Sequence, residues 1–251
     1  VNKLNDGCIS YFENDSNIGM TENWNKSITL ASGDFIIMLH DDDELLYNFF
    51  EWLNSIISKY EFDILIPPNN FDKLRKNNYY KFIKITNFQL NFSNTIGPPV
   101  GIVIKRKSLN TIFKAEYYPS IDYKFYSDVC AYLKVIKVKG SPLVNYNIGV
   151  NESLKIDTLL NFLKKDRIIK KECESNNCII GIFLARLYLP VYEIYYLQSM
   201  KKKFRLKLEN QVPQKLNRNL TIYELILFRV IRFIIRIYVY FNSTLAHKNK
   251  L

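Results

Sequence analysis

The stretch Phe35-Ile36-Ile37-Met38-Leu39-His40-Asp41-Asp42-Asp43-Glu44 joins an apolar run to four consecutive acidic residues. An apolar run of this kind predicts a strand that is buried on both faces. Four adjacent carboxylates repel one another, and hard divalent cations such as Mg²⁺ and Mn²⁺ bind such oxygen ligands. Ligands of open α/β sheets lie outside the carboxyl ends of the strands. The stretch therefore predicts an α/β fold with a metal ion and a phosphorylated ligand at this strand end.

The acidic residues also have a purely structural interpretation. An apolar stripe with helical spacing follows them, formed by Leu45, Leu46, Phe49, Phe50, Leu53, Ile56 and Ile57. Acidic side chains at the start of a helix cap it and interact favourably with its positive end. A helix cap needs fewer carboxylates than the four present here. We therefore assign Glu44 to the start of the helix and the other acids to a ligand.

A polar loop and an amphipathic segment precede the apolar run. The loop contains Asn17 and Gly19, and the segment has an apolar face with helical spacing, formed by Met20, Trp24, Ile28 and Ala31. Gly33 is placed to end this helix as its C-cap residue. The predicted order is loop, helix, glycine, buried strand and acidic residues.

This order and spacing resemble the core signature of the family 2 glycosyltransferases. The matching residues, in order, are Asn17, Gly19, Asn23, Asn25, Ala31, Gly33, Asp34, Phe35, Ile36, Leu39, His40, Asp42 and Asp43. The resemblance implies a GT-A-like fold, a mixed α/β sheet flanked by helices. It also implies a nucleotide-sugar donor held through Mn²⁺ or Mg²⁺, with Asn17, Gly19 and Asn23 at the donor.

The acidic motif departs from the family's pattern at its first position. The usual motif is Leu-Asp-x-Asp-Asp, and His40 stands here at the first acid, with Asp41 at the variable position. In this register, Asp42 and Asp43 are the metal ligands, and His40 and Asp41 lie beside the nucleotide-sugar. A shifted register makes Asp41 and Asp43 the Asp-x-Asp pair, and both registers remain open. His40 is either a metal ligand or a hydrogen-bonded neighbour of the carboxylates.

Asp122 is the candidate catalytic base. Ser120 is suited to cap a helix that continues to Leu133, which places Asp122 in the first helical turn. In inverting members of the family, a carboxylate at a matching acid-aromatic position takes the proton from the acceptor hydroxyl, and a raised pKa suits that role. The alternative is that Asp122 only stabilises the helix dipole. Asp128, inside the helix, is a weaker candidate.

Two further segments continue the resemblance. Residues 97–106 predict a tight turn and an apolar strand with a basic end, which in the family lines the sugar and acceptor side. A turn and a core strand explain the same residues without a role in binding. Residues 143–153 resemble a strand that ends in Tyr-Arg, but Asn147 replaces the arginine. Either another residue or the metal alone then neutralises the leaving diphosphate.

The resemblance also predicts how the chain is organised. The family normally begins with a strand, a helix and a second strand that are not recognisable before residue 14. We therefore expect an N-terminally truncated GT-A-like domain over residues 1–153 that lacks its first nucleotide-binding strands. Residues 154–251 are expected to form a mainly helical, basic region. The four cysteines show no metal-ligand spacing, which favours reduced thiols in a cytosolic protein.

The positive charge is concentrated in the C-terminal region. Of the 35 basic and 24 acidic residues, 16 of each lie in residues 1–150, so the whole net charge of +11 belongs to residues 151–251. Lys201 to Lys207 form a basic cluster there. Basic residues alone do not make a nucleic-acid-binding protein, and no such scaffold is recognisable, so we expect no nucleic-acid partner.

The same region contains two long apolar stretches. Charged residues interrupt both Ile179–Met200 and Ile222–Phe241, so neither predicts a clean membrane span. The second carries Arg229, Arg232 and Arg236 on one side, which fits a helix lying on an anionic membrane surface. The alternative is a helix packed on the catalytic domain with solvated arginines. We expect a cytoplasmic protein, peripheral at the inner face of the cell membrane.

The sequence thus predicts an inverting, metal-dependent glycosyltransferase. The metal stabilises the leaving nucleoside diphosphate, and Asp122 deprotonates a hydroxyl of a glycan or lipid-linked acceptor, which attacks the anomeric carbon. His40, Asn147 and the unrecognised beginning motivate an alternative. This alternative is a catalytically inactive binding or scaffold module at the membrane surface.

Overall fold

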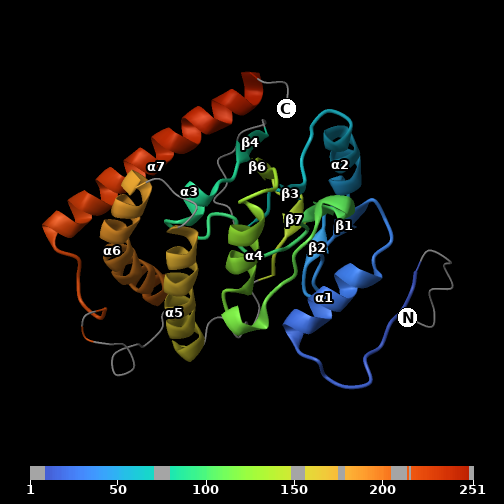
Figure 1. Cartoon of the computed structure of the whole chain (residues 1–251), viewed down its shortest axis with the longest axis horizontal. Coiled ribbons are helices and arrows are strands. Elements are labelled where there is room, and N and C mark those ends of the chain that lie inside the picture. Colours follow the sequence, from blue (N-terminus) through green and yellow to red (C-terminus); the bar gives the residue numbers. More distant parts are fainter. Residues whose placement is uncertain are drawn as a thin grey trace.

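The computed structural model describes residues 9–70, 80–147, 156–174, 179–204, 214 and 216–248. These residues form a mixed sheet flanked by helices, followed by a helical C-terminal region (Figure 1). The predicted fold class is therefore confirmed. The predicted boundary between residues 153 and 154 lies outside the described residues, and so do residues 71–79. Cys8 and Cys178 also lie outside them, whereas Cys130 and Cys173 are free thiols.

The main sheet has five strands in the described residues, in the order β1-β5-β3-β6-β4. Their bounds are Phe35–Ile37 for β1, Ile64–Ile66 for β3, Lys81–Lys84 for β4, Val103–Lys105 for β5 and Val135–Lys139 for β6. Only the β3–β6 pair is parallel, while β5 runs antiparallel to both β1 and β3, and β4 runs antiparallel to β6. A second, two-stranded sheet joins β2 (Glu44–Leu45) to β7 (Val144–Asn145).

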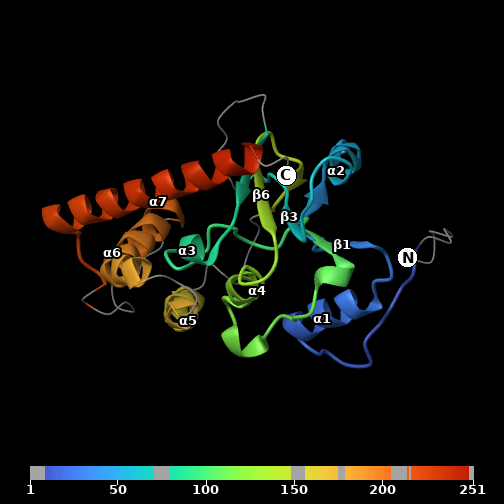
Figure 2. The same ribbon diagram turned by 45° about the horizontal axis from the view of Figure 1, so that its top comes forward.

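Each face of the main sheet packs against a different helix, because side chains alternate along the strands. On one face, Ile64 and Ile104 pack with Phe125 of α4 (Ile121–Val129). On the other, Leu65 and Val103 pack with α2 (Phe49–Ile57). The helices α2 and α4 therefore cover opposite faces of the sheet (Figure 2).

Strand β1 is shorter and less buried than the sequence predicts. It covers only Phe35–Ile37, and only Ile36 of these three residues is buried. Both of its faces are covered, because Ile36 packs in the cluster that contains α4, and Phe35 and Ile37 pack, partly buried, against the cluster that contains α2. β1 is an edge strand of the described sheet, with β5 as its neighbour, so its burial is incomplete. Backbone bonds nevertheless continue past the strand end, from the Met38 N–H to the Ile102 carbonyl and from the Gly101 N–H to the Met38 carbonyl.

Two predicted helix boundaries are also wrong. The helix α1 (Met20–Leu30) ends at the C-cap residue Ala31, not at Gly33. The helix α2 begins after Asn48, because Glu44 and Leu45 are drawn into β2 by pairing with β7. The acidic residues therefore do not cap α2, and the structural interpretation of the cluster does not hold.

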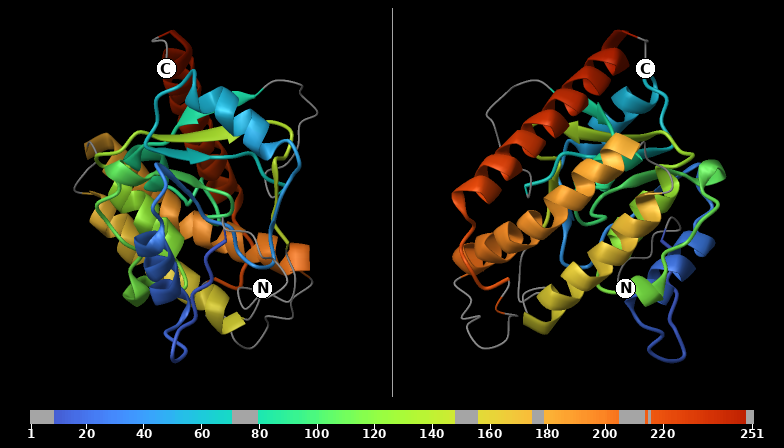
Figure 3. Two further views of the ribbon diagram at one scale, coloured as in Figure 1. Left: turned by 90° about the vertical axis from the view of Figure 1, so that its right-hand side faces the viewer. Right: turned by 60° about the vertical axis from the view of Figure 1, so that its left-hand side comes forward.

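The C-terminal region is helical, as predicted. It consists of α5 (Ile156–Cys173), α6 (Ile179–Phe204) and α7 (Ile222–Lys248), which lie on the side of the molecule away from α1 and α2 (Figure 1). α7 packs against α6 and runs past the edge strand β4 (Figure 3). A separate apolar cluster joins this region to the short helix α3 (Asn87–Leu90), and its buried members are Phe92, Ala185, Tyr188, Val191, Phe228 and Ile231. Residues 205–207 of the basic cluster lie outside the described residues.

In the described part of the chain, one helix is long and apolar enough to cross a membrane. This segment, Ile179–Met200 of α6, meets the criterion by length and composition, and a third of it is buried in the structure. The expectation that charged residues exclude a span here is therefore too strict. Within the structure, however, α6 is a packed helix: Glu193 is 1 % exposed and its carboxylate pairs with the guanidinium of Arg167 on α5.

Candidate functional site

The acidic loop, residues 40–43, lies directly beyond the carboxyl end of β1. A turn closes it, because the backbone N–H of Asp43 donates to the carbonyl of His40 at 3.2 Å. The chain then enters β2 at Glu44. This confirms the predicted placement of the acids at a strand end. It brings His40, Asp42 and Asp43 together with ligand atoms within 4.8 Å of one another.

The acidic loop contains buried polar atoms with unused bonding capacity. The side chain of Asp43 is 0 % exposed, and its Oδ2 lies 3.3 Å from Nδ1 of His40. Oδ2 of Asp43 and Nε2 of His40 are buried without a hydrogen bond in the described part of the chain. Burial raises the pKa of Asp43, and the charge of Asp42 adds to this effect. A divalent cation would satisfy these atoms and relieve the repulsion, so the residues fit such an ion.

The second sheet fastens the acidic loop. The backbone N–H of Asn147, just beyond β7, donates to Oδ1 of Asp43 at 3.0 Å, and its side-chain amide donates to the carbonyl of Asp42. The amide of Asn145 donates to Oε2 of Glu44 at 3.1 Å. Asn147, which stands where the family pattern has arginine, therefore holds the loop in place. These contacts span about a hundred residues of sequence, so no local pattern reveals them.

Helix α1 contributes Trp24 to the same site. The indole ring of Trp24 stacks on His40 with ring centroids 5.0 Å apart and planes inclined by 7°. The adjacent Asn25 fixes the helix, because its side-chain amide exchanges two 2.9 Å hydrogen bonds with the backbone of Phe113. The helical spacing of the sequence places Trp24 only on an apolar helix face. Its second contact, with His40, was missed.

Of the three predicted donor residues on the N-terminal side, Asn17 and Gly19 lie in the loop before α1 and Asn23 lies on α1. Asn17 accepts a 2.9 Å hydrogen bond from the N–H of Gly19, which precedes the first residue of the helix. Asn23 accepts one from the amide of Asn14, and it lines a shallow depression between α1 and residues 10–14. In the described part of the chain, no hydrogen bond joins these residues to the acidic loop. Asp41 belongs to that loop and is exposed.

Asp122 lies in the first turn of α4, as predicted, and Ser120 is the N-cap residue. The Ser120 hydroxyl donates to Oδ1 of Asp166 on α5 instead of capping the helix. Burial raises the pKa of Asp122 to about 7, and the nearby charge of Asp166 contributes to the rise. A carboxyl with this pKa is suited to take up a proton near neutral pH.

Asp128, the weaker candidate, has a structural role. Its carboxylate accepts ion pairs from Lys114 at 2.9 Å and from Lys124 at 2.7 Å. Lys124 also pairs with Glu172 of α5 at 2.7 Å. Asp128 therefore helps to join α4 to its neighbours, and Asp122 remains the candidate base on this helix.

One segment, residues 94–101, connects the candidate base with the acidic loop. At one end, the amide of Asn94 donates to Oδ2 of Asp122 at 2.9 Å. At the other end, Gly101 bonds to the carbonyl of Met38, two residues before His40. Gly101 has a φ of 66°, and a Cβ there would lie 2.7 Å from Cγ2 of Val144 in β7. The segment thus contacts α4, the end of β1 and the second sheet.

The comparison with known families agrees with this geometry. Residues 1–113 match the model described as Glycosyl transferase family 2. The match includes α1, β1 and the acidic loop, and the mixed sheet with its flanking helices is consistent with a GT-A-like α/β fold. A comparison with curated proteins gives no match.

Proposed function

We propose that this chain, which carries a family 2 glycosyltransferase-like domain, transfers a sugar from a nucleotide-sugar to a hydroxyl of a glycan or lipid-linked acceptor, with inversion at the anomeric carbon. The observation that carries the proposal is the pair of sites joined by residues 94–101. One is the acidic loop with its unsatisfied buried atoms. The other is Asp122, whose pKa is raised to about 7.

The acidic loop is the proposed metal and donor site. Asp42 and Asp43 would hold Mn²⁺ or Mg²⁺, and His40 either joins them as a ligand or orients Asp43 through its Nδ1. When bound, the cation supplies positive charge that stabilises a leaving nucleoside diphosphate. We assign Asn17, Gly19, Asn23 and Asp41 to the donor because the family match spans them.

Asp122 is the proposed general base. Its carboxylate accepts the proton of the acceptor hydroxyl while that oxygen bonds to the anomeric carbon, and the bond from this carbon to the diphosphate oxygen breaks. Attack from the face opposite the leaving group inverts the anomeric centre. With a pKa of about 7, a large fraction of Asp122 is deprotonated at neutral pH. The same pKa gives the carboxylate more basicity than an exposed aspartate has.

The test of the metal site is calorimetry with Mn²⁺ and either UDP or GDP. Wild-type protein is expected to bind a nucleoside diphosphate in a Mn²⁺-dependent manner, and a variant with Asp42→Asn and Asp43→Asn should lose that dependence. The control is Asp34→Asn, an exposed aspartate at the opposite end of β1. Metal-dependent binding that survives in the double variant would overturn the metal role. Absence of nucleotide binding in the wild type would favour the scaffold alternative.

We also propose that the protein acts at an anionic membrane surface on the cytoplasmic side. The support is α7, which turns Phe228 and Ile231 inward and exposes apolar side chains on its other side. The exposed members are Ile222, Tyr223, Leu225, Ile226, Val230, Phe233, Ile234, Ile237, Tyr240 and Phe241. Arg229 and Arg236 are exposed along one edge of this apolar face, whereas Arg232 packs over the rings of Tyr195 and Phe228.

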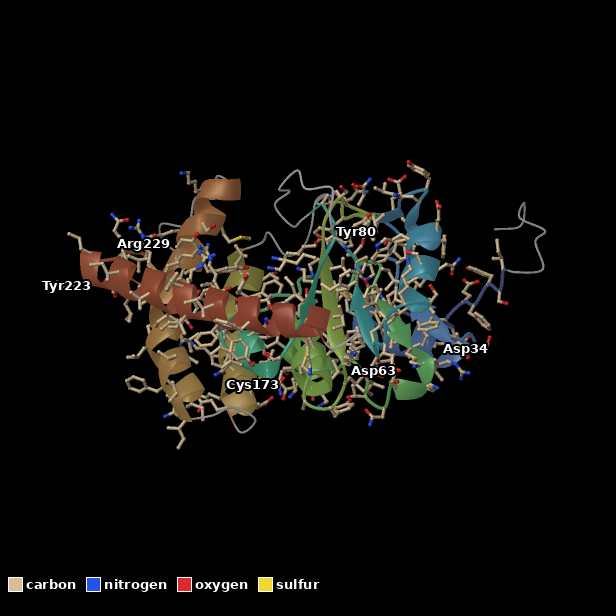
Figure 4. All side chains as sticks on the ribbon, turned by 90° about the horizontal axis from the view of Figure 1, so that it is seen from above. Asp34, Asp63, Tyr80, Cys173, Tyr223 and Arg229 are labelled. Atoms are coloured by element: carbon tan, nitrogen blue, oxygen red, sulfur yellow. The ribbon has the colours of Figure 1, made fainter. Side chains whose placement is uncertain are left out.

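An apolar face bordered by arginines suits the boundary between lipid headgroups and acyl chains. Figure 4 shows Tyr223 and Arg229 projecting from the surface of α7. We favour this peripheral arrangement over a span by α6, because spanning would separate the nearly fully buried Glu193 from Arg167. Nothing in the proposed function calls for a nucleic-acid partner.

A further inference from the structure

We propose that Asn94 is the positioning residue of the catalytic base: it holds the carboxylate of Asp122 in one orientation and favours its deprotonated form. The inference rests on the proposed function of Asp122, and it adds a residue for which the sequence offered no signal. Asn94 lies 28 positions before Asp122, in the loop that follows α3.

The side-chain amide of Asn94 has only one orientation that satisfies its surroundings. Its Oδ1 accepts hydrogen bonds from the backbone N–H groups of Ile96 at 3.2 Å and Gly97 at 3.1 Å. Because that end must accept, the other end must donate, and Nδ2 donates to Oδ2 of Asp122 at 2.9 Å. Rotating the amide by half a turn would place Nδ2 against the two backbone N–H groups, which are also donors. It would place Oδ1 against the carboxylate of Asp122, which is also an acceptor. Asn94 is therefore a fixed donor.

The loop that carries Asn94 is itself anchored to the sheet. The ammonium of the buried Lys137 on β6 donates to the carbonyls of Thr95 and Ile96, each at 3.0 Å. Ile96 is 1 % exposed, so its side chain also fixes the loop. A hydrogen-bond donor held by a packed strand can orient its partner more closely than one on an exposed loop.

Burial favours the protonated form of Asp122, whereas the backbone N–H groups of Tyr123 and of Asp122 itself, like Asn94, donate hydrogen bonds that favour the carboxylate. Asp166 from α5 adds negative charge, and the phenol groups of Tyr126 on α4 and Tyr196 on α6 face the same region. The nearby Lys170 and Glu193 contribute opposite charges that act on Asp166. A donated hydrogen bond stabilises a carboxylate more than a carboxylic acid, so the bond from Asn94 works against burial and against Asp166.

The test measures the protonation of Asp122 without any substrate. In protein labelled with ¹³C at aspartate side chains, the carboxyl signal of Asp122 is identified by its loss in Asp122→Asn. The titration midpoint is expected near 7 in the wild type. Asn94→Ala should raise it by about one pH unit, because a hydrogen bond to a charged group is lost. Asn94→Asp should raise it further, since it replaces the donor by a second carboxyl group.

The matched control is Asn91→Ala. Asn91 lies three positions earlier and is more deeply buried than Asn94, but neither atom of its side-chain amide has a hydrogen-bond partner in the described part of the chain. Its removal should leave the midpoint of Asp122 unchanged. If Asn94→Ala does not fold, Asn94→Asp carries the test, because its carboxylate retains the shape and both bonds from Ile96 and Gly97.

A second measurement separates orientation from protonation. Release of nucleoside diphosphate from a mixture of UDP- and GDP-sugars, followed well above the midpoint, should be about tenfold slower in Asn94→Ala, because the base is deprotonated but misplaced. An unchanged titration midpoint in both Asn94 variants would overturn the inference while leaving the proposed function intact. Full activity of Asp122→Asn would instead overturn the proposed function.

Discussion

The α/β part of the molecule and the helix α7 differ in the groups that lack a partner within the structure. In the α/β part, apolar side chains are packed on both sides of the sheet, and the unsatisfied atoms are buried polar ones, among them those of the acidic loop. In α7, Arg229 and Arg236 are solvated, and the surface without a partner is apolar, with Phe233 63 % exposed. Unpaired buried polar atoms call for an ion or ligand, whereas a large exposed apolar face calls for a partner surface. Under the proposed function, catalysis and membrane binding therefore belong to separate parts of the chain.

If this separation is correct, the largest expected effect is a variant that loses sugar transfer but still binds membranes. Asp122→Asn should reduce sugar transfer by about 10²–10⁴-fold, because an amide cannot accept the proton. Binding of UDP or GDP with Mn²⁺ and binding to vesicles should be unchanged. In the wild type, the transfer rate should fall as the pH drops below about 7, where Asp122 becomes protonated. Joint loss of transfer, nucleotide binding and thermal stability would mean that Asp122 is structural.

Part of this comparison could be predicted from the sequence. The acidic loop was located because an apolar run followed by acids is a local pattern, and Ser120 and Asp122 were placed by the local start of a helix. The C-terminal helices followed from long apolar stretches. Each of these features depends on residues close together in the chain.

What the sequence did not reveal depends on partners far away in the chain. Glu44 lies in a strand because β7, a hundred residues later, pairs with it. The incomplete burial of β1 depends on the order of strands in the sheet. Asn94 and Trp24 acquire their roles only through contacts with Asp122 and His40. Helical and strand periodicity contain no information about such contacts.

The second prediction is the converse: a variant that loses membrane binding but keeps its catalytic activity. A variant with Phe233→Glu and Ile237→Glu should bind vesicles containing anionic phosphatidylglycerol about a hundredfold more weakly, because two apolar side chains are replaced by charges. Donor turnover in solution should be unchanged. Ile112→Glu, which changes an exposed isoleucine after β5, is the control. Equal vesicle binding by all three proteins would rule out α7 as the membrane contact.

A third prediction tests whether residues 94–101 hold the two halves of the candidate site together. Gly101→Ala should lower the free energy of unfolding by about 2–3 kcal/mol, because it adds a clash with Val144 to a positive φ. Gly97→Ala also changes a glycine with positive φ, but no atom lies within 4 Å of its Cβ position, so about 1 kcal/mol is expected. Urea unfolding measures both. An equal loss of unfolding free energy in the two variants would show that the close approach of Gly101 to β7 does not affect stability.

The smallest expected effect distinguishes the contribution of the arginines of α7 to membrane binding from that of its apolar face. Arg229→Gln and Arg236→Gln should each weaken binding to anionic vesicles about fivefold, since a basic residue near such a surface contributes about 1 kcal/mol. Raising the ionic strength should reduce this difference, because the arginines are exposed and their attraction is screened. Arg186→Gln is the control, since this exposed arginine pairs with Glu174, just beyond the end of α5. The apolar substitutions should instead weaken binding at every ionic strength. If the two arginine variants bind like the wild type at low salt, the membrane contact is purely apolar and the preference for anionic lipid is wrong.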